Sequence, residues 1–177
     1  MIYLVRHGEA AAGWGDHPDP GLSELGYEQA EAVSARLARL GATSLISSPM
    51  QRCQETATPF AAQIGKEAQI APTVSEIVTP DDVTDRVAWL RALMGGVWPD
   101  TMLGWCRAAH DTVDALPNGC AVFSHFVAIN AIVGQVTGQR DVLVFKPGHC
   151  SITVLARTGQ GRLEVKALGD EAITRVL

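Results

Sequence analysis

Two arginines and two histidines of this sequence each lie just past a short apolar run. They are Arg6, His7, Arg52 and His125. Two guanidinium groups suit a tetrahedral dianion, whereas a carboxylate is satisfied by one arginine. The chain has neither a P-loop motif nor an Asp-rich magnesium site. A neutral imidazole that attacks phosphorus in line can move a phosphoryl group without metal, so these residues predict covalent phosphoryl chemistry if the fold brings them together.

Arg6 and His7 follow the apolar run 2–5, whose residues are typical of a buried parallel strand. In open α/β sheets, ligands bind at the carboxyl ends of the strands, which is where these two side chains are expected. Gly8 and Glu9 complete the polar segment. Taken alone, the segment is equally consistent with a strand that simply becomes polar where it reaches solvent. The other candidate residues must therefore decide between a ligand site and an ordinary strand end.

Arg52 is expected at the same edge, from a second strand–turn–helix unit. Residues 43–47 predict a strand, and a helix is expected directly after it, with Ser48 as N-cap and Pro49 at the first helical position. Arg52 would then lie in the first turn of this helix, beside backbone N–H groups that attract anions.

His125 follows a third apolar run, 119–123, which predicts a buried strand leading into a helix over residues 127–136. A histidine at such a place is usually a hydrogen-bonded core residue. That interpretation weakens because His7 has the same position on another strand. We therefore expect both imidazoles at one edge, where His125, if protonated, adds a positive donor.

The whole pattern predicts an α/β fold: a three-layer sandwich, with helices on both faces of a mostly parallel central sheet that has one antiparallel strand. The other expected elements are helices over 23–40, 79–94 and 101–116, a short strand within 69–77, and a hairpin of 151–156 and 162–167. The length of 177 residues, without a linker, predicts a single domain over residues 1–177.

Four stretches resemble, in order, the motifs of the histidine phosphatase superfamily, the phosphoglycerate-mutase-like proteins. They are residues 4–9 (LVRHGE), 21–30 (GLSELGYEQA), 47–57 (SSPMQRCQETA) and 124–125 (SH). The first and third are the most specific. The resemblance favours the short bacterial-type phosphatase branch.

The resemblance implies a role for each matching residue. His7 becomes the phosphohistidine, while Arg6, Arg52 and His125 hold the phosphoryl oxygens. It also implies that an acidic residue after the second helix donates the proton to the leaving group, and Glu76 lies where that residue is expected.

Four further residues belong to this expected site. Asp81 and Asp82 are the other candidates for the proton donor, and Glu9 and Ser23, from the first two motifs, are expected to bind substrate. The resemblance implies no metal and no cofactor. His149 and Cys150 are adjacent, so on a strand they would face opposite sides, and without partners they predict no metal site.

The sequence departs from the family pattern at two positions and lacks the family's Gly-aromatic-Glu-Gly run after the acid. Phe126 follows the second histidine where the family often has Gly, so an apolar wall there could narrow the pocket or favour an aromatic leaving group. Gly13 stands where mutase-like members have Asn, and the short chain lacks room for their long cap insertion. Trp14 and Trp98 could stack on an aromatic group or pack in the protein.

The favoured interpretation is a metal-independent phosphatase that hydrolyses a phosphomonoester through phosphorylated His7. The alternatives are a phosphoglycerate mutase-like transferase, a protein phosphohistidine phosphatase, which would need no strong acid, and a phosphate-binding or sensing protein without turnover. The expected partner is a small phosphorylated molecule or a phosphoprotein, and the sequence leaves the oligomeric state open.

The composition excludes other classes. The net charge is −5 and no basic run occurs, which argues against a nucleic-acid surface. The four cysteines lie far apart, as expected for reduced thiols of a cytoplasmic protein. The chain opens without a signal-peptide pattern, and its longest apolar stretch, 120–134, contains Ser124 and His125 and is too short to span a membrane.

Overall fold

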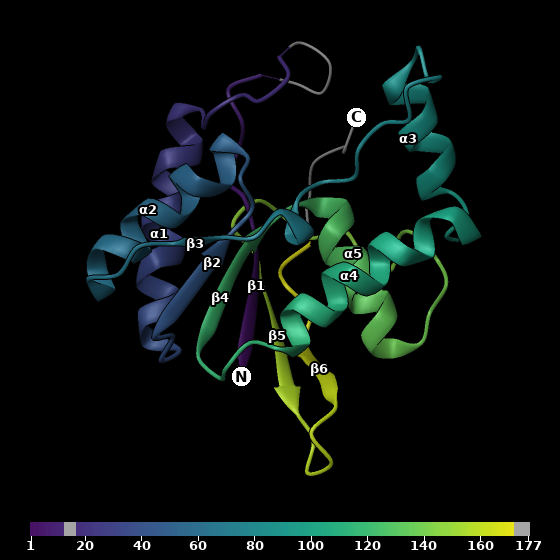
Figure 1. The fold of residues 1–177 in the computed structure, drawn as a ribbon. Coiled ribbons are helices and arrows are strands. Elements are labelled where there is room, and N and C mark those ends of the chain that lie inside the picture. Colours follow the sequence, from purple (N-terminus) through teal and green to yellow (C-terminus); the bar gives the residue numbers. More distant parts are fainter. Residues whose placement is uncertain (13–16, 172–177) are drawn as a thin grey trace.

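A computed structural model describes residues 1–12 and 17–171 of the chain. Its centre is a six-stranded sheet in the order β3-β2-β4-β1-β5-β6 (Figure 1). The strands are β1 (Ile2–Arg6), β2 (Ser44–Ser47), β3 (Gln69–Ile70), β4 (Cys120–Ser124), β5 (Ile152–Arg157) and β6 (Leu163–Ala167).

β5 is the one strand of this sheet that runs against the others. β1, β2, β3 and β4 pair in parallel, whereas β5 is antiparallel to both β1 and β6. The expected α/β sandwich with a mostly parallel sheet and one antiparallel strand is therefore confirmed.

Helices cover both faces of the sheet, with α1 and α2 on one side and α4 and α5 on the other (Figure 1). The helices are α1 (Glu24–Arg39), α2 (Gln51–Ile64), α3 (Arg86–Met94), α4 (Leu103–Asp114) and α5 (Phe126–Thr137), with short 3-10 turns η1 (Pro72–Val74) and η2 (Asp100–Met102). α3 lies toward the end of the molecule at which β1 finishes (Figure 1).

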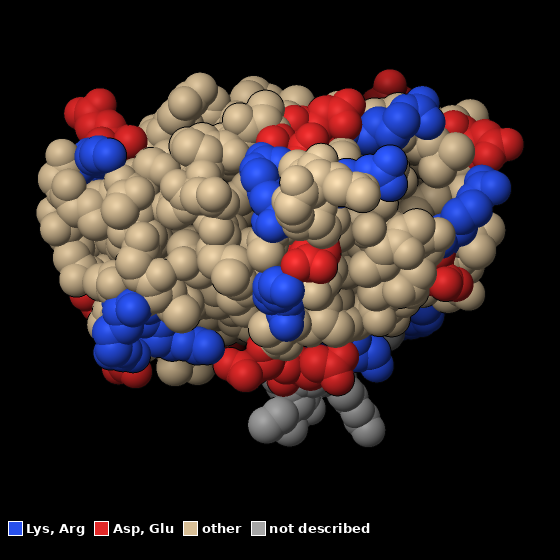
Figure 2. Space-filling view, turned by 90° about the horizontal axis from the view of Figure 1, so that it is seen from below, with Lys and Arg blue, Asp and Glu red and all other residues tan. Residues whose placement is uncertain are grey.

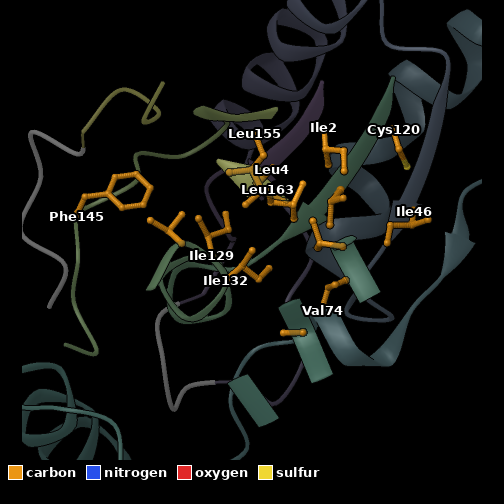
Figure 3. Packing of buried hydrophobic residues seen from close by; sticks show 14 residues of the cluster. Ile2, Leu4, Ile46, Val74, Cys120, Ile129, Ile132, Phe145, Leu155 and Leu163 are labelled. Carbon is orange, nitrogen blue, oxygen red and sulfur yellow. The ribbon is translucent and has the colours of Figure 1, made fainter. Parts of the chain in front are cut away.

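The buried run of β1 belongs to both cores because its side chains alternate between the two faces. Ile2 and Leu4 pack with α4 and α5 (Figure 3), and Tyr3 and Val5 pack with α1 and α2. None of the four is more than 4% exposed. Burying an apolar side chain of this size contributes about 1.5–3 kcal/mol, which fixes β1 in the middle of the sheet.

Two predicted boundaries are wrong for identifiable reasons. The strand expected within 69–77 stops at Ile70, because Pro72 lacks the N–H that would continue the ladder and starts η1 instead. The helix expected from residue 79 begins at Arg86, where Asp85 caps it by accepting a hydrogen bond from the Ala88 N–H at 2.9 Å.

The helix after β2 also starts later than expected. α2 begins at Gln51, and Ser48 accepts a hydrogen bond from the N–H of Met50 at 3.2 Å, one turn before the helix proper. Arg52 nevertheless remains in the first turn. The N-cap role of Ser23 on α1 is confirmed by its hydrogen bond from the Gly26 N–H at 3.0 Å.

Acidic and basic side chains are interspersed on the face of the molecule that Figure 2 shows. All four cysteines are buried and unpaired, which confirms the expectation of free thiols. Across residues 1–12 and 17–171, none of the helices combines the length and the apolar character that crossing a membrane requires.

Candidate active site

Three chain segments meet where β1 ends. The N–H of His7 donates to the carbonyl of Ser124 at 3.0 Å, and the N–H of Arg6 donates to the carbonyl of Ser151 at 3.3 Å. The imidazoles of His7 and His125 consequently lie 5.2 Å apart, centroid to centroid. The predicted placement of the two histidines at one sheet edge is thus seen in the structure.

His7 is held in the tautomer that a nucleophile needs. Its Nδ1 lies 2.7 Å from the carbonyl oxygen of Gly8, which can only accept, so Nδ1 carries the proton and Nε2 keeps its lone pair. Burial, followed by the proximity of His125, Arg6 and Arg52, lowers the pKa of His7 well below its ordinary value. The ring is therefore neutral at neutral pH.

Close backbone contacts hold the segment that follows His7. A Cβ on Gly8 would lie 2.7 Å from the carbonyl oxygen of Gly26, and a Cβ on Gly26 would collide with the carbonyl oxygen of Glu9. The Gly8 N–H also donates to Thr56 Oγ1 of α2 at 3.0 Å. The glycine of the first motif is thus required by the approach of β1 to α1.

Arg6 is 6% exposed, and hydrogen bonds hold one side of its guanidinium. One terminal nitrogen donates to the carbonyl of Pro147 at 2.9 Å, and the other lies 2.9 Å from His149 Nε2. The guanidinium stacks over the ring of Phe126 at 5.2 Å. Its buried Nε–H has no partner among the described atoms. Burial lowers the pKa of Arg6 to about 10, so it stays charged.

Arg52 reaches His125 from the first turn of α2. A terminal nitrogen of Arg52 lies 3.1 Å from His125 Nδ1. Its other terminal nitrogen lies 3.7 Å from Asp19. Both oxygens of Asp19 also accept from the N–H of Gln51, at 3.0 and 3.1 Å. The helix N-terminus that was expected to attract an anion therefore binds this carboxylate.

His125 is fully buried behind the two arginines and is neutral. Burial first, and then Arg52 and Arg6, lower its pKa well below the ordinary value. Its Nδ1 accepts from Arg52, so Nε2 carries the proton and donates to Ser48 Oγ at 2.8 Å. In this geometry His125 is not the positive donor considered above.

Glu76 is buried at the N-terminal end of α5. Its two oxygens accept from the N–H groups of Ile77 at 3.1 Å and Val127 at 3.3 Å. Burial raises the pKa of Glu76, and this effect outweighs those two hydrogen bonds and the nearby arginines. A carboxyl with a raised pKa holds its proton to higher pH, as a proton donor must. Asp81 and Asp82 are exposed.

A cavity of about 1030 Å³ opens above these residues. Arg6, His7, Arg52 and Glu76 are among its polar lining residues. The lining also has a large apolar part, with Ala10, Pro20, Met50, Ile77, Val78 and Val87.

The remaining predicted residues take different places. Glu9 lines this cavity, while Ser23 donates from its hydroxyl to Glu9 at 2.8 Å and is not among the described residues of the lining. Trp98 is buried against Trp105. Gly13 and Trp14 fall outside the described residues.

Comparison with known proteins agrees with this arrangement. Residues 2–86 match the model of the histidine phosphatase superfamily (branch 1). The probable phosphoglycerate mutase GpmB of Yersinia pestis (strain Pestoides F) is 30% identical over 163 residues, covering 78% of this chain and 75% of that protein. The chain belongs to the histidine phosphatase superfamily. This membership supports phosphoryl transfer through a histidine, of the phosphatase or the mutase type.

Solved structures share the superfamily fold over nearly the whole chain. A mycobacterial glucosyl-3-phosphoglycerate phosphatase superimposes with a TM-score of 0.79 at 18% identity, covering 97% of this chain and 99% of that one. The phosphoserine phosphatase of Entamoeba histolytica, in complex with 3-phosphoglyceric acid, gives 0.76 at 18% identity, with 96% of each chain covered.

Phe126 does not form the apolar wall of the pocket that was expected from the sequence. Its ring is 2% exposed, carries the guanidinium of Arg6 and packs in the cluster that contains Leu90 and Trp98. Phe126 is absent from the described lining of the cavity.

Sequence reasoning missed several residues of the site. Asp19 acts through a tertiary contact that no local pattern reveals, and Thr56, inside the third motif, was given no role. Arg86 lines the cavity and donates to Thr79. His149 could have been found, because an antiparallel strand that pairs with β1 begins at the same edge as the site. No group of three or more His, Cys, Asp or Glu that could hold a metal ion occurs in the described ranges.

Proposed function

We propose that this chain is a phosphatase that hydrolyses a phosphomonoester through a phosphohistidine on His7. The observation that carries the proposal is the state of His7: a neutral ring whose Nδ1 donates to Gly8, leaving Nε2 as a nucleophile beside Arg6 and Arg52. A neutral imidazole among fixed positive charges suits attack on a phosphoryl group.

The two arginines are proposed to hold the phosphoryl oxygens. The buried Nε–H of Arg6 supports this role, since such a donor is stabilised by an anionic acceptor. Arg52 approaches from α2 and would neutralise charge on the equatorial oxygens during transfer. His125 is proposed to bind another oxygen after Arg52 turns to the phosphoryl group: the ring proton then lies on Nδ1 and is donated to that oxygen, while Nε2 accepts from the Ser48 hydroxyl.

Glu76 is proposed as the acid and then the base. In the first step, Nε2 of His7 forms a bond to phosphorus, the phosphorus–oxygen ester bond breaks, and Glu76 gives its proton to the departing oxygen. In the second step, a water molecule attacks the phosphohistidine and loses its proton to the Glu76 carboxylate, which releases phosphate and restores both residues. The raised pKa of Glu76 supports the first of these roles.

The cavity favours a small phosphorylated molecule with an apolar leaving group. Met50, Ile77, Val78 and Val87 contribute apolar surface, and a phosphorylated aryl or alkyl alcohol would remove it from water. A phosphatase is preferred to a mutase because a mutase must retain a polar triose acid for a second transfer, and this apolar surface suits such an acid poorly.

A mutase is the second candidate, on one specific observation. Arg86 adds a third arginine to the lining, and it could bind the carboxylate of a phosphoglycerate. The name of the Yersinia relative points the same way. Transfer of label between two positions of one phosphoglycerate, with no net release of phosphate, would support the mutase.

The test is incubation with an aryl phosphate, quenched at short times in alkaline denaturant, because the phosphorus–nitrogen bond of phosphohistidine is labile in acid, and read by intact mass. Wild type should release phosphate and carry one phosphoryl group, while His7→Ala should do neither. His110→Ala is the matched control, since His110 lies on α4 and bonds to its neighbour Asp111. Turnover that survives in His7→Ala, without an adduct, would overturn the proposed nucleophile.

A further inference from the structure

His149 lies directly before β5, and its imidazole touches the phosphoryl-binding arginine of β1. A terminal nitrogen of Arg6 is 2.9 Å from His149 Nε2. The His149 ring centroid lies 5.9 Å from that of His7, and its side chain lines the cavity. Three imidazoles therefore surround the site, although a phosphohistidine mechanism as described uses only His7 and His125.

The contact with Arg6 fixes the tautomer of His149. A guanidinium has five donors and no acceptor, so Nε2 of His149 must be the acceptor and the ring proton lies on Nδ1. Burial, and then the charge of Arg6, lower the pKa of His149 to about 4, against the opposing effect of Glu9. His149 is thus a neutral acceptor.

The backbone around His149 is held in one unusual conformation. Cys150, the next residue, has a φ of 52°, in the left-handed region that non-glycine residues rarely adopt. Its N–H donates to the carbonyl of Arg6 at 3.0 Å, and the N–H of Arg6 donates to Ser151 at 3.3 Å. Such strain persists only where surrounding contacts fix it, and it is often found at functional sites.

We propose that His149 is a positioning residue that sets the orientation of the Arg6 guanidinium for phosphoryl binding. The carbonyl of Pro147 accepts a hydrogen bond from one terminal nitrogen of Arg6, and His149 accepts one from the other. The ring of Phe126 lies against the face of the guanidinium. The remaining N–H donors, including the buried Nε–H, are thereby held for phosphoryl oxygens. This inference rests on the proposed role of Arg6 in the phosphatase.

The test compares two substitutions of similar size. His149→Gln keeps an oxygen acceptor at about the reach of Nε2, and His149→Leu keeps bulk but removes the acceptor. Affinity for inorganic phosphate is measured by calorimetry, and turnover is measured with an aryl phosphate. His110→Ala is the control, and near-ultraviolet circular dichroism checks that each variant is folded.

His149→Leu should bind phosphate about 10-fold more weakly and lose about 10- to 100-fold in kcat/KM, because a misplaced binding group is costly. His149→Gln should recover most of both losses. Equal affinity in wild type and His149→Leu, or an equal loss in the Leu and Gln variants, would overturn the inference. If wild type binds phosphate but hydrolyses no ester, the proposed phosphatase fails while the comparison of phosphate affinities still tests His149.

Discussion

The guanidinium of Arg52 lies 3.1 Å from Nδ1 of His125, just as that of Arg6 lies 2.9 Å from Nε2 of His149. Arg52 and Arg6 therefore each have an imidazole acceptor, and burial first, then the neighbouring cation, lowers the pKa of both imidazoles so that they stay neutral. The charge at this sheet edge comes from arginines, whose charge does not change over the physiological pH range.

The first prediction concerns Glu76 and the leaving group. Glu76→Gln should reduce hydrolysis of an alkyl phosphate by about 100-fold or more, because an alkoxide needs a proton to depart. Hydrolysis of nitrophenyl phosphate should fall less than about 10-fold, since nitrophenolate departs unaided. Steady-state rates on the two esters give the comparison. Equal losses on both would exclude Glu76 as the proton donor, and no loss on either would favour phosphohistidine as substrate.

The pH dependence of alkyl ester hydrolysis follows from the same carboxyl. The pKa of Glu76 is raised, so the acid form persists to higher pH than an ordinary glutamate, and activity should fall as pH rises through that pKa. The residual activity of Glu76→Gln should not show this fall with rising pH. If the variant shows the same fall as wild type, the pH dependence belongs to another group.

A second prediction links the buried histidines to stability. The pKa values of His7, His125 and His149 are all lowered by folding. The unfolded chain therefore binds more protons below pH 6.5, and the free energy of unfolding should decrease as pH falls from 6.5 toward 4.

His149→Gln isolates one part of this effect. The pKa of His149 falls to about 4 in the folded state, and after discounting for partial exposure it should account for about 1–2 kcal/mol across this window. The variant should lose less stability than wild type on acidification, by roughly 2–8 °C in Tm. Identical pH profiles of Tm would contradict the lowered pKa.

Asp19 is predicted to compete with the phosphoryl group for Arg52. Asp19→Asn removes a negative charge 3.7 Å from the guanidinium and should tighten the binding of inorganic phosphate by roughly 2- to 5-fold. Asp100→Asn makes the same charge change at an exposed ion pair with Arg140 and serves as the control. Equal phosphate affinity in the two variants would show that Asp19 does not restrain the site.

The apolar residues that line the cavity are predicted to select the leaving group. Val78 is 80% exposed and lines the cavity, so Val78→Asp should leave folding intact while lowering kcat/KM for naphthyl phosphate by about 10-fold. Val97→Asp, at a residue 58% exposed and not among the described lining, is the control. A loss that is just as large for a small polar phosphate ester would argue against an apolar leaving group.

The strands that carry the site could be predicted because each of these buried strands is a short apolar run in the sequence. β1 and β4 end at Arg6 and Ser124, within a residue or two of the predicted boundaries. The motif order placed Arg6, His7, Arg52, His125 and Glu76, and the structure brings all five to one region.

What the sequence does not reveal depends on contacts between distant residues. His149 reaches Arg6 over 143 positions, through the antiparallel pairing of β5 with β1. The contact of Asp19 with α2 spans 32 positions. The late start of α3 depends on Asp85, whose side chain caps the helix at Arg86.

The central place of β1 has a consequence for how the protein is made. β1 is synthesised before both of its neighbours in the sheet, β4, from Cys120, and β5, from Ile152. At ribosomal speeds the strand waits on the order of ten seconds before either neighbour exists. An apolar strand that must wait so long is exposed to other chains and to chaperones, and the segment that bears His7 is then among the last parts of the sheet to be completed.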